Sequence, residues 1–356
     1  MIELTEKQRL IVETTESKVV VVASAAAGKT RCITERVRWL LEHGVAPEKI
    51  VAITFTNAAA EEISERLNSP AGVFIGTIHS LANTFLRMSG VDTSQILNEE
   101  KFDELFACIK KNPHCIQEVE HLIVDEAQDS NPEQFEFLLD MIMPSNFMLM
   151  GDHRQSIYRW NGAEPDYILD LMENPEITVY ELDENFRNAP EILDYAKKLI
   201  RPAGADYKDH SIPMSKVRGA VVDVEYSGAG IAKTIKKRVD AGQDEPRDWF
   251  ILTRSNAQSE EMIGHLKKMG IPYDTFKKSN LDNKGLNEKM KENTVKVLTI
   301  HTAKGLEAKN VVVIGAHFKD VEERCIAYVA ATRARDLLVW TRSPNKRKPS
   351  TTMWST

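Results

Sequence analysis

The chain has 356 residues and a net charge of −7 at neutral pH, a length that suits about two domains with sizeable cores. No apolar run approaches the ~20 residues that span a bilayer. The charged N-terminus MIELTEKQRL lacks a signal-peptide core, so we expect no membrane association and a cytoplasmic location. The four cysteines lack the paired spacing of a zinc site, which favours reduced, free thiols.

Charge is divided unevenly between the two halves of the chain. Residues 1–185 carry 15 Lys and Arg against 32 Asp and Glu, a net −17, whereas residues 186–356 carry 31 against 21, a net +10; together these give the −7 of the whole chain. The basic second half favours an anionic partner. The alternative is that charge simply varies along the chain without a functional cause.

Apolar, β-branched runs alternate with helical patterns in both halves. The predicted strands of the first half are Val19–Ala23, Ile50–Phe55, His121–Asp125 and Phe147–Gly151. Those of the second half are Val221–Tyr226, Trp249–Arg254, Val295–Ile300, Asn310–Gly315 and Asp336–Thr341. Such strands, separated by helices, are typical of buried parallel sheets, so we predict an α/β fold in two lobes, residues 1–185 and 186–356. The stretch 201–216 is predicted to be a loop or linker, and the basic tail 343–356 a hairpin turn or a disordered end.

The segment VVVVASAAAGKT, residues 19–30, joins a predicted strand to a predicted helix through a loop of small residues. This order is typical of a P-loop, in which backbone N–H groups and a helix N-terminus hold phosphates. Lys29 would reach the β- and γ-phosphates, and the Thr30 hydroxyl would bind Mg²⁺. Because Ala23 stands at the first glycine of the GxxxxGK[ST] pattern, the motif alone is moderately specific, and a chance AAAGKT at a helix start is the alternative.

An acidic pair follows about 95 residues later, where the predicted strand HLIV ends in Asp125 and Glu126. Asp125 would hold Mg²⁺ directly or through water, and Glu126 would activate the attacking water. Such a pair is usually a solvated turn, but its place after a P-loop favours catalysis. Arg187 and Arg333 are candidates for the cations that stabilise a transferred phosphoryl group, although arginines of purely structural use are commoner.

The segment GDHRQSIYRWNG, residues 151–162, follows the apolar run NFMLM. Gln155 could orient a water or contact a phosphate, and Tyr158 and Trp160 could stack on bases. The alternative is that Trp160 only covers the edge of a sheet; Arg154 and Arg159 in the same segment favour a role in ligand binding.

Taken in order, the motifs resemble those of superfamily 1 helicases of the UvrD/Rep type, over nearly the whole chain. The matching segments are LTEKQRLIV, ASAAAGKTR, AITFTNAAAEEISERL, GTIHSLANTFLR, VDEAQD, GDHRQSIYRWNGAEP, ENFRNAPEIL, LTIHTAKGLEAKNVVVIG and EERCIAYVAATRAR. The resemblance implies two RecA-like lobes, each a mostly parallel sheet flanked by helices, with the ATP site in the cleft between them.

The resemblance also implies roles for individual residues. Gln155 would contact the γ-phosphate and its attacking water, and Arg187 and Arg333 would be arginine fingers, beside Lys29, Asp125 and Glu126 in the roles given above. The implied ATP-binding residues are Gln8, Ala23, Ser24, Ala25, Ala26, Ala27, Gly28, Lys29, Thr30, Arg31, Phe186 and Glu307, and the implied Mg²⁺ ligands are Thr30 and Asp125. The implied DNA-binding residues are Phe55, Thr56, Asn57, Thr77, His79, Tyr158, Trp160 and His301.

The sequence departs from the family pattern in several places. Ala26 and Ala27 stand where the family usually has Gly and Ser, and Phe186 where it often has the tyrosine that stacks on adenine. Ala58 and Asn161 stand where Lys and Arg are common, which predicts weaker DNA binding. The insertions, at about 87–120 and about 277–293, are much shorter than those of the family. The loss of the large second-lobe insertion puts processive strand separation in doubt, but not ATP hydrolysis or translocation. The basic tail could act as a separation wedge or could be a plain basic end.

We therefore expect an ATP-hydrolysing translocase and helicase, with Mg²⁺ as cofactor and 3′→5′ polarity, that binds single-stranded DNA and its junctions with duplex. We expect a monomer in a bacterial cell or phage-infected host, with accessory replication or repair proteins as candidate partners. The first alternative is a DNA-stimulated ATPase that translocates or displaces proteins but needs a partner to unwind. The others are a P-loop kinase or nucleotide-binding regulator, and a helicase–nuclease, for which we expect no room after the last motif.

Overall fold

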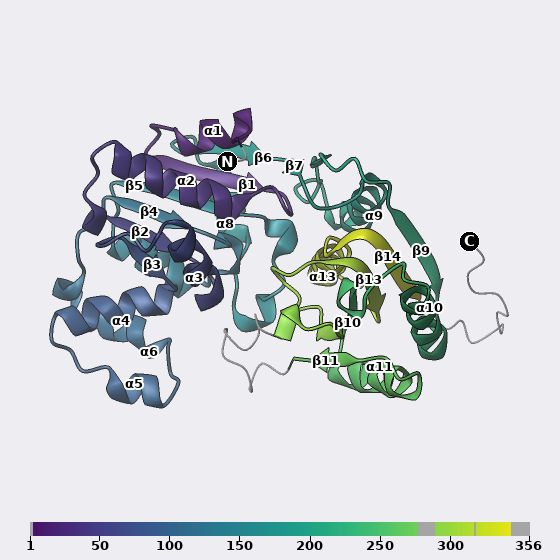
Figure 1. The fold of residues 1–356 in the computed structure, drawn as a ribbon. Coiled ribbons are helices and arrows are strands. Elements are labelled where there is room, and N and C mark those ends of the chain that lie inside the picture. Colours follow the sequence, from purple (N-terminus) through teal and green to yellow (C-terminus); the bar gives the residue numbers. More distant parts are fainter. Residues whose placement is uncertain (1–2, 277–288, 317, 343–356) are drawn as a thin grey trace. The chain divides into compact units, whose positions relative to one another are not determined.

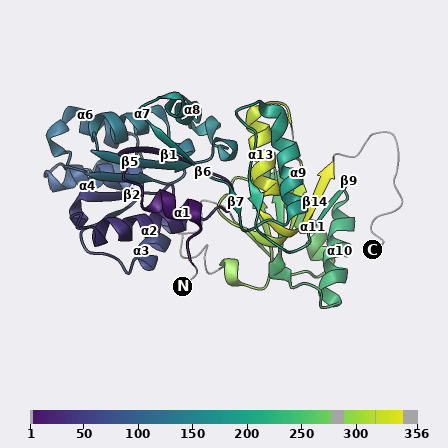
Figure 2. The ribbon, with the colours of Figure 1, turned by 90° about the horizontal axis from the view of Figure 1, so that it is seen from above.

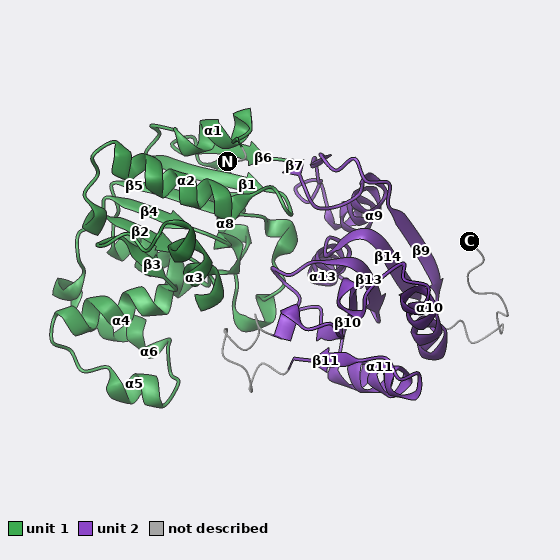
Figure 3. Cartoon of the chain, viewed as in Figure 1, with its two compact units in different colours: residues 1–183 green, residues 184–356 purple. Residues whose placement is uncertain are grey.

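A computed structural model describes residues 3–276, 289–316 and 318–342 (Figure 1). The chain divides into two compact units, Met1–Asp183 and Glu184–Thr356 (Figure 3). The sequence predicts lobes that meet between residues 185 and 186, two residues after this division. Most of the predicted second insertion, residues 277–288, and the basic tail, residues 343–356, lie outside the described residues.

The first unit is built on a six-stranded sheet in the order β3-β2-β4-β5-β1-β6, in which every pairing is parallel. Its strands are β1 (Lys18–Ala23), β2 (Ile50–Ile53), β3 (Phe74–Gly76), β4 (His121–Val124), β5 (Asn146–Gly151) and β6 (Thr178–Leu182). Successive side chains of a strand point to opposite faces, so Val20 packs in one core cluster while Val19 and Val21 pack in the other. Both faces are therefore covered, which explains why β1 reads as an unbroken apolar run.

Helices cover both faces of this sheet. Helices α4, α6, α7 and α8 lie on one face, and α1, α2 and α3 lie on the other (Figure 2). The helices of this unit are α1 (Glu6–Val12), α2 (Lys29–Glu42), α3 (Asn57–Arg66), α4 (Ile78–Met88), α5 (Ser94–Asn98), α6 (Glu104–Lys111), α7 (Pro132–Phe135) and α8 (Asp166–Glu173). The predicted short insertion between α4 and β4 consists of α5, α6 and a 3-10 turn (Pro113–Cys115). Leu105, Phe106 and Ile109 of α6 are fully buried in the core of the unit.

The second unit repeats the plan with a six-stranded parallel sheet in the order β11-β12-β10-β13-β14-β9. Its strands are β9 (Ala220–Glu225), β10 (Trp249–Thr253), β11 (Tyr273–Thr275), β12 (Val295–Thr299), β13 (Ala308–Ile314) and β14 (Ala334–Arg342), and β7 (Glu184–Asn185) pairs separately with β8 (Ile212–Pro213). Helices α9 (Pro190–Ile200) and α13 (Val321–Ala331) pack together, and α10 (Gly228–Asp240) packs with α11 (Asn256–Lys268).

The predicted α/β fold with two parallel sheets is confirmed, and all nine predicted strands are present with ends shifted by one or two residues. Strands β3, β6, β7, β8 and β11 were not predicted. The predicted loop 201–216 is irregular apart from a 3-10 turn at Arg201–Ala203 and the two residues of β8. All four cysteines are free. Within the described ranges, no helix combines the length and apolarity that crossing a bilayer requires.

Candidate nucleotide and DNA sites

The predicted P-loop follows β1 and leads directly into α2, which begins at Lys29. Gly28 has a φ of +87°, and a Cβ atom there would lie 2.8 Å from the Nε2 atom of Gln8. The position therefore requires glycine for its backbone conformation and for the close approach of Gln8. Ala26 also has a left-handed backbone, with a φ of +57°, which is strained for a residue with a Cβ. This explains why glycine is usual at that position of the family motif.

Lys29 lies among carboxylates at the carboxyl edge of the sheet. Its Nζ atom is 3.0 Å from Oε1 of Glu126, and only 11% of its side chain is exposed. Burial alone lowers the pKa of Lys29, but the negative charges of Glu126, Asp125 and Asp152 outweigh burial and hold the pKa above its ordinary value. Lys29 is therefore charged at neutral pH.

The acidic pair at the end of β4 is held by the backbone and by a neighbouring amide. The backbone N–H of Asp125 donates to the carbonyl of Ile53 at 2.8 Å, and Asp125 Oδ1 accepts the N–H of Glu126 at 2.9 Å. Gln128 Nε2 donates to Glu126 Oε2 at 2.5 Å. Glu126 thus shares its two oxygens between Lys29 and Gln128, while Asp125 is 8% exposed.

The loop after β5 is organised around a buried carboxylate, Asp152, whose role we did not predict. Its Oδ1 accepts Nε of Arg154 at 2.6 Å, and its Oδ2 accepts Nε2 of Gln155 at 2.8 Å. Burial alone would raise the pKa of Asp152, but Arg154, His153 and these hydrogen bonds lower it below its ordinary value. Arg154 Nη2 also donates to Ser24 Oγ at 3.3 Å, so this network joins the loop after β5 to the P-loop. The sequence shows Asp152 after the predicted strand, but it does not show these partners.

The aromatic residues predicted to contact DNA come together from two segments. The rings of Phe55 and Tyr158 stack with centroids 5.2 Å apart, and Tyr158 and Trp160 lie 6.3 Å apart with tilted planes. Tyr158 is 8% exposed, whereas Phe55 is 40% and Trp160 66% exposed. Tyr158 is therefore the buried member of this aromatic group, and Phe55 and Trp160 form its solvent-exposed surface. Arg159 forms ion pairs with Asp166 at 2.8 Å and Glu164 at 3.8 Å.

The remaining predicted DNA contacts of the first unit lie at helix starts. The Thr56 and Thr77 hydroxyls accept the N–H groups of Ala59 and Ser80, and so cap α3 and α4. Asn57 is the first residue of α3. His79 packs against the ring of Phe106 with centroids 5.2 Å apart. Since α3, α4, Glu126 and the Gln155 loop all follow parallel strands, they meet the P-loop at one edge of the sheet, where open α/β sheets bind ligands.

The second unit brings three of its predicted residues together. Arg187 forms an ion pair with Glu307, and its Nη1 donates to the Thr332 carbonyl at 3.4 Å. Arg333 is 2% exposed and donates to the carbonyls of Val329 at 3.0 Å and Leu306 at 3.4 Å. Phe186 is 46% exposed. His301 follows β12 and is half-buried.

A bound Mg²⁺ ion would need only one or two ligands from the protein at this site. In the part of the chain that the structure describes, no group of three or more His, Cys, Asp or Glu side chains could hold a metal ion. Mg²⁺ in phosphoryl-transfer sites is commonly held by one or two protein oxygens together with substrate phosphates and water. Thr30 at the start of α2 and Asp125 after β4 fit that smaller requirement.

Two models of one protein family match this chain. The family model described as UvrD/REP helicase N-terminal domain matches residues 4–112 and 102–176, and the model described as UvrD-like helicase C-terminal domain matches residues 274–344. The chain belongs to the UvrD/Rep helicase family. The predicted resemblance is thereby confirmed. The matched ranges of this family leave out residues 177–273, which include Phe186 and Arg187.

Several curated helicases are similar to this chain. ATP-dependent DNA helicase PcrA of Bacillus subtilis is 27% identical over 367 residues, covering 75% of this chain and 49% of that protein. DNA helicase II of Escherichia coli is 24% identical, covering 77% and 51%. ATP-dependent DNA helicase Rep of Buchnera aphidicola is 27% identical, covering 77% and 57%. The chain spans about half the length of the curated relatives it matches.

Proposed function

We propose that this chain hydrolyses ATP to move along single-stranded DNA and to separate duplex, with 3′→5′ polarity. The observation that carries the proposal is the loop of residues 151–162. It holds Gln155 on the buried Asp152 beside the P-loop, and a few residues later it presents Trp160, 66% exposed, beside Phe55 and Tyr158. A single short segment can thus serve a nucleotide and a stack of bases.

In this proposal, residues at the carboxyl edge of the first sheet carry out the hydrolysis of ATP. In the proposed reaction Lys29 exchanges Glu126 for phosphate oxygens, which frees a Glu126 oxygen to take a proton from the attacking water. Mg²⁺ held by Thr30 and Asp125 would neutralise charge on the phosphates. Gln155 orients the water. Arg187 and Arg333 of the second unit stabilise the charge that develops on the transferred phosphoryl group.

A partner-dependent motor is the second candidate function, favoured by the size of the first insertion. Only α5, α6 and one turn lie between α4 and β4, and the buried face of α6 belongs to the core of the first unit. No separate subdomain is built at this place within the described residues of the first unit. This motor would hydrolyse ATP and translocate but would unwind only when a partner supplies contacts with duplex.

The test is ATP hydrolysis with and without a single-stranded oligonucleotide, for the wild type, Glu126→Gln and Trp160→Ala. Met88→Ala is the matched control, because Met88 is 68% exposed at the end of α4. We expect DNA to stimulate the wild type and Met88→Ala, Trp160→Ala to need more DNA for half-maximal stimulation, and Glu126→Gln to be inactive. Hydrolysis indifferent to DNA would contradict the motor and favour a nucleotide-binding regulator.

Duplexes with a 3′ or a 5′ single-stranded tail then separate the two motors. Unwinding of the 3′-tailed duplex by the chain alone supports the autonomous helicase. DNA-stimulated hydrolysis without unwinding of either duplex supports the partner-dependent motor.

A further inference from the structure

Arg36 is a buried arginine of α2 to which the proposed reaction gives no role. It is 5% exposed, and its Nη1 donates to the carbonyl oxygens of Val12 at 2.8 Å and Thr14 at 2.7 Å. The guanidinium carbon lies 4.7 Å from the centroid of the Trp39 ring. The two hydrogen bonds fasten the carboxyl end of α1, and the segment after it, to the side of α2.

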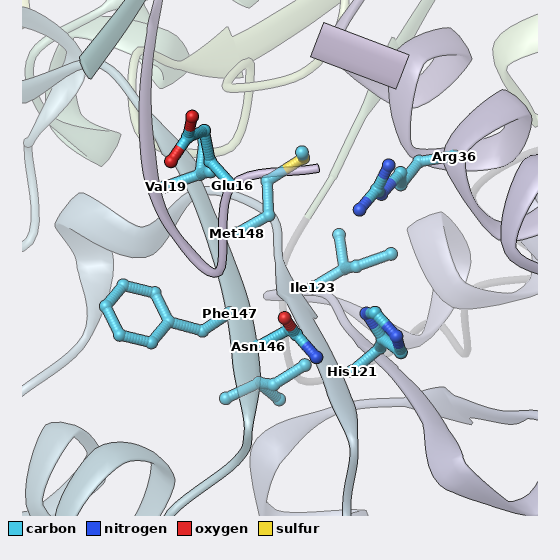
Figure 4. Close-up of a pocket in the computed structure, with 9 residues that line it drawn as sticks. Glu16, Val19, Arg36, His121, Ile123, Asn146, Phe147 and Met148 are labelled. Carbon is cyan, nitrogen blue, oxygen red and sulfur yellow. The ribbon is translucent and has the colours of Figure 1, made fainter. Parts of the chain in front are cut away.

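The surroundings of Arg36 leave no room for a ligand of its own. Arg36 lines a cavity of about 10 Å³ together with His121, Ile123, Asn146 and Met148 (Figure 4). This is space for about one water molecule. The hydrogen bonds to the two carbonyls are therefore the main interaction of the guanidinium group, and Arg36 anchors α1 within the fold.

The other end of α1 is fastened to the P-loop. Gln8 is 2% exposed; its Oε1 accepts the N–H of Thr5 at 3.2 Å, and its Nε2 donates to the carbonyl of Ala27 at 3.1 Å. The absence of a Cβ atom at Gly28 is what allows Gln8 to lie this close. Since α1 has only seven residues, it is too short to be stable by itself; these two attachments hold it in place together with the burial of Ile11 and Val12 in the core.

The attachments close a ring of contacts. The P-loop leads into α2 at Lys29, α2 carries Arg36 about two turns later, Arg36 holds the end of α1, and Gln8 of α1 returns to the P-loop. A strained backbone such as that of Ala26 persists only where its surroundings over-determine it. The ring supplies such a constraint.

We propose that Arg36 is a positioning residue for the nucleotide site: by anchoring α1 it keeps Gln8 against the P-loop and so keeps the loop in its phosphate-binding shape. The inference rests on the proposed function, since it assumes that the P-loop binds ATP. Its consequence is that Arg36 and Gln8 act as one unit, although Arg36 has no contact with the loop among the interactions of the described residues.

The experiment is a double-mutant cycle with Arg36→Met and Gln8→Ala, read as KM for ATP and kcat at saturating ATP and DNA. Losing the charged hydrogen bonds of Arg36 is expected to raise KM about tenfold and to leave kcat within about twofold. The double variant should have nearly the KM of Gln8→Ala, because the two changes break the same ring. Arg36→Lys, which keeps a donor for the carbonyls, should recover part of the affinity.

Arg38→Met is the matched control, because Arg38 lies on the same helix, is 38% exposed and pairs with Glu35. Its KM should equal that of the wild type. Thermal unfolding of every variant identifies general destabilisation, and Arg36→Lys carries the test if Arg36→Met does not fold. An unchanged KM in the folded Arg36 variants, or KM effects of Arg36 and Gln8 that multiply independently, would overturn the inference. A wild type that neither binds nor hydrolyses ATP would overturn the proposed function instead.

Discussion

In the first unit, Lys29, Glu126 and Gln155 follow three neighbouring parallel strands and meet at one edge of the sheet, already paired with opposite charges or amides. In the second unit, Arg187 is held by Glu307, and Arg333 is buried against backbone carbonyls of its own unit. In the proposed reaction the first set already lies beside the P-loop, and Lys29 has to exchange one partner, Glu126, for phosphate oxygens. The second set must exchange existing partners before either arginine can meet a phosphate. From this difference we propose that the first unit supplies most of the binding of the triphosphate and that the second unit supplies transition-state stabilisation.

Arg187→Ala should produce the largest effect and tests the second half of this comparison. An arginine that stabilises phosphoryl transfer contributes about 10³-fold or more to turnover, so kcat should fall by at least that factor while the Kd for ATP stays within about threefold. Stopped-flow binding of a fluorescent ATP analogue and steady-state hydrolysis measure the two quantities. Arg335→Ala, an exposed arginine on β14, is the control. A large rise in Kd would contradict the division of roles.

Lys29→Met tests the first half of the comparison. Removing the ammonium leaves Glu126 and Asp125 without a positive charge that offsets theirs and removes charged hydrogen bonds to phosphate, each of which contributes about 1.5–3 kcal/mol. The Kd for ATP should therefore rise by about tenfold to a hundredfold, in contrast to Arg187→Ala. Equilibrium titration with the same fluorescent analogue measures it. An unchanged Kd would mean that the P-loop is not the triphosphate site.

Ala26→Gly tests whether the left-handed backbone at Ala26 is strained. A left-handed alanine costs roughly 1–2 kcal/mol, so glycine at this position should stabilise the first unit by about 1 kcal/mol after its own entropic cost. Ala25→Gly is the matched control, since Ala25 is outside the left-handed region and glycine there should destabilise by about 0.5–1 kcal/mol. Urea unfolding of the three proteins measures the difference. Equal urea midpoints for Ala26→Gly and Ala25→Gly would show that the backbone at Ala26 is not strained.

His121 gives the smallest expected effect, at the amino-end edge of the same sheet. Burial and the positive charge of Arg36 lower its pKa below 6.5, with Glu120 opposing. The unfolded chain then binds this proton more readily than the folded chain, so the stability contributed by neutral His121 is present above pH 6.5 and is lost as pH falls below it. Urea unfolding of wild type and His121→Asn at pH 7.5, 6.5 and 5.5 measures this. The wild type should lose more stability than the variant on acidification, and equal losses would contradict the account.

Strands that are buried on both faces could be predicted from the sequence, whereas short or partly exposed strands could not. Strands β1, β4 and β5 are predictable because interior parallel strands are apolar on both faces. Strand β6 was missed because it lies at the sheet edge with Val179 and Glu181 exposed, and β3 because it has three residues. The positions of Lys29, Glu126 and Gln155 were predicted from motifs that follow strands.

The network around Asp152 could not be predicted in the same way. Its partners Ser24 and Gln128 come from other loops, and only the folded sheet edge brings them together. Ala26 is an intermediate case. The sequence shows an alanine where glycine is usual, but only the structure shows the left-handed backbone that favours glycine at this position.

The most direct test of the central claim, that residues 151–162 serve both nucleotide and DNA, is the Kd for a single-stranded oligonucleotide measured with and without a non-hydrolysable ATP analogue. The wild type should show at least about a fivefold change on adding the analogue, the lower end of usual coupling between sites. Gln155→Ala should bind DNA with the affinity of the nucleotide-free wild type and should show no change. A wild-type Kd indifferent to the analogue, or full coupling in Gln155→Ala, would contradict the account.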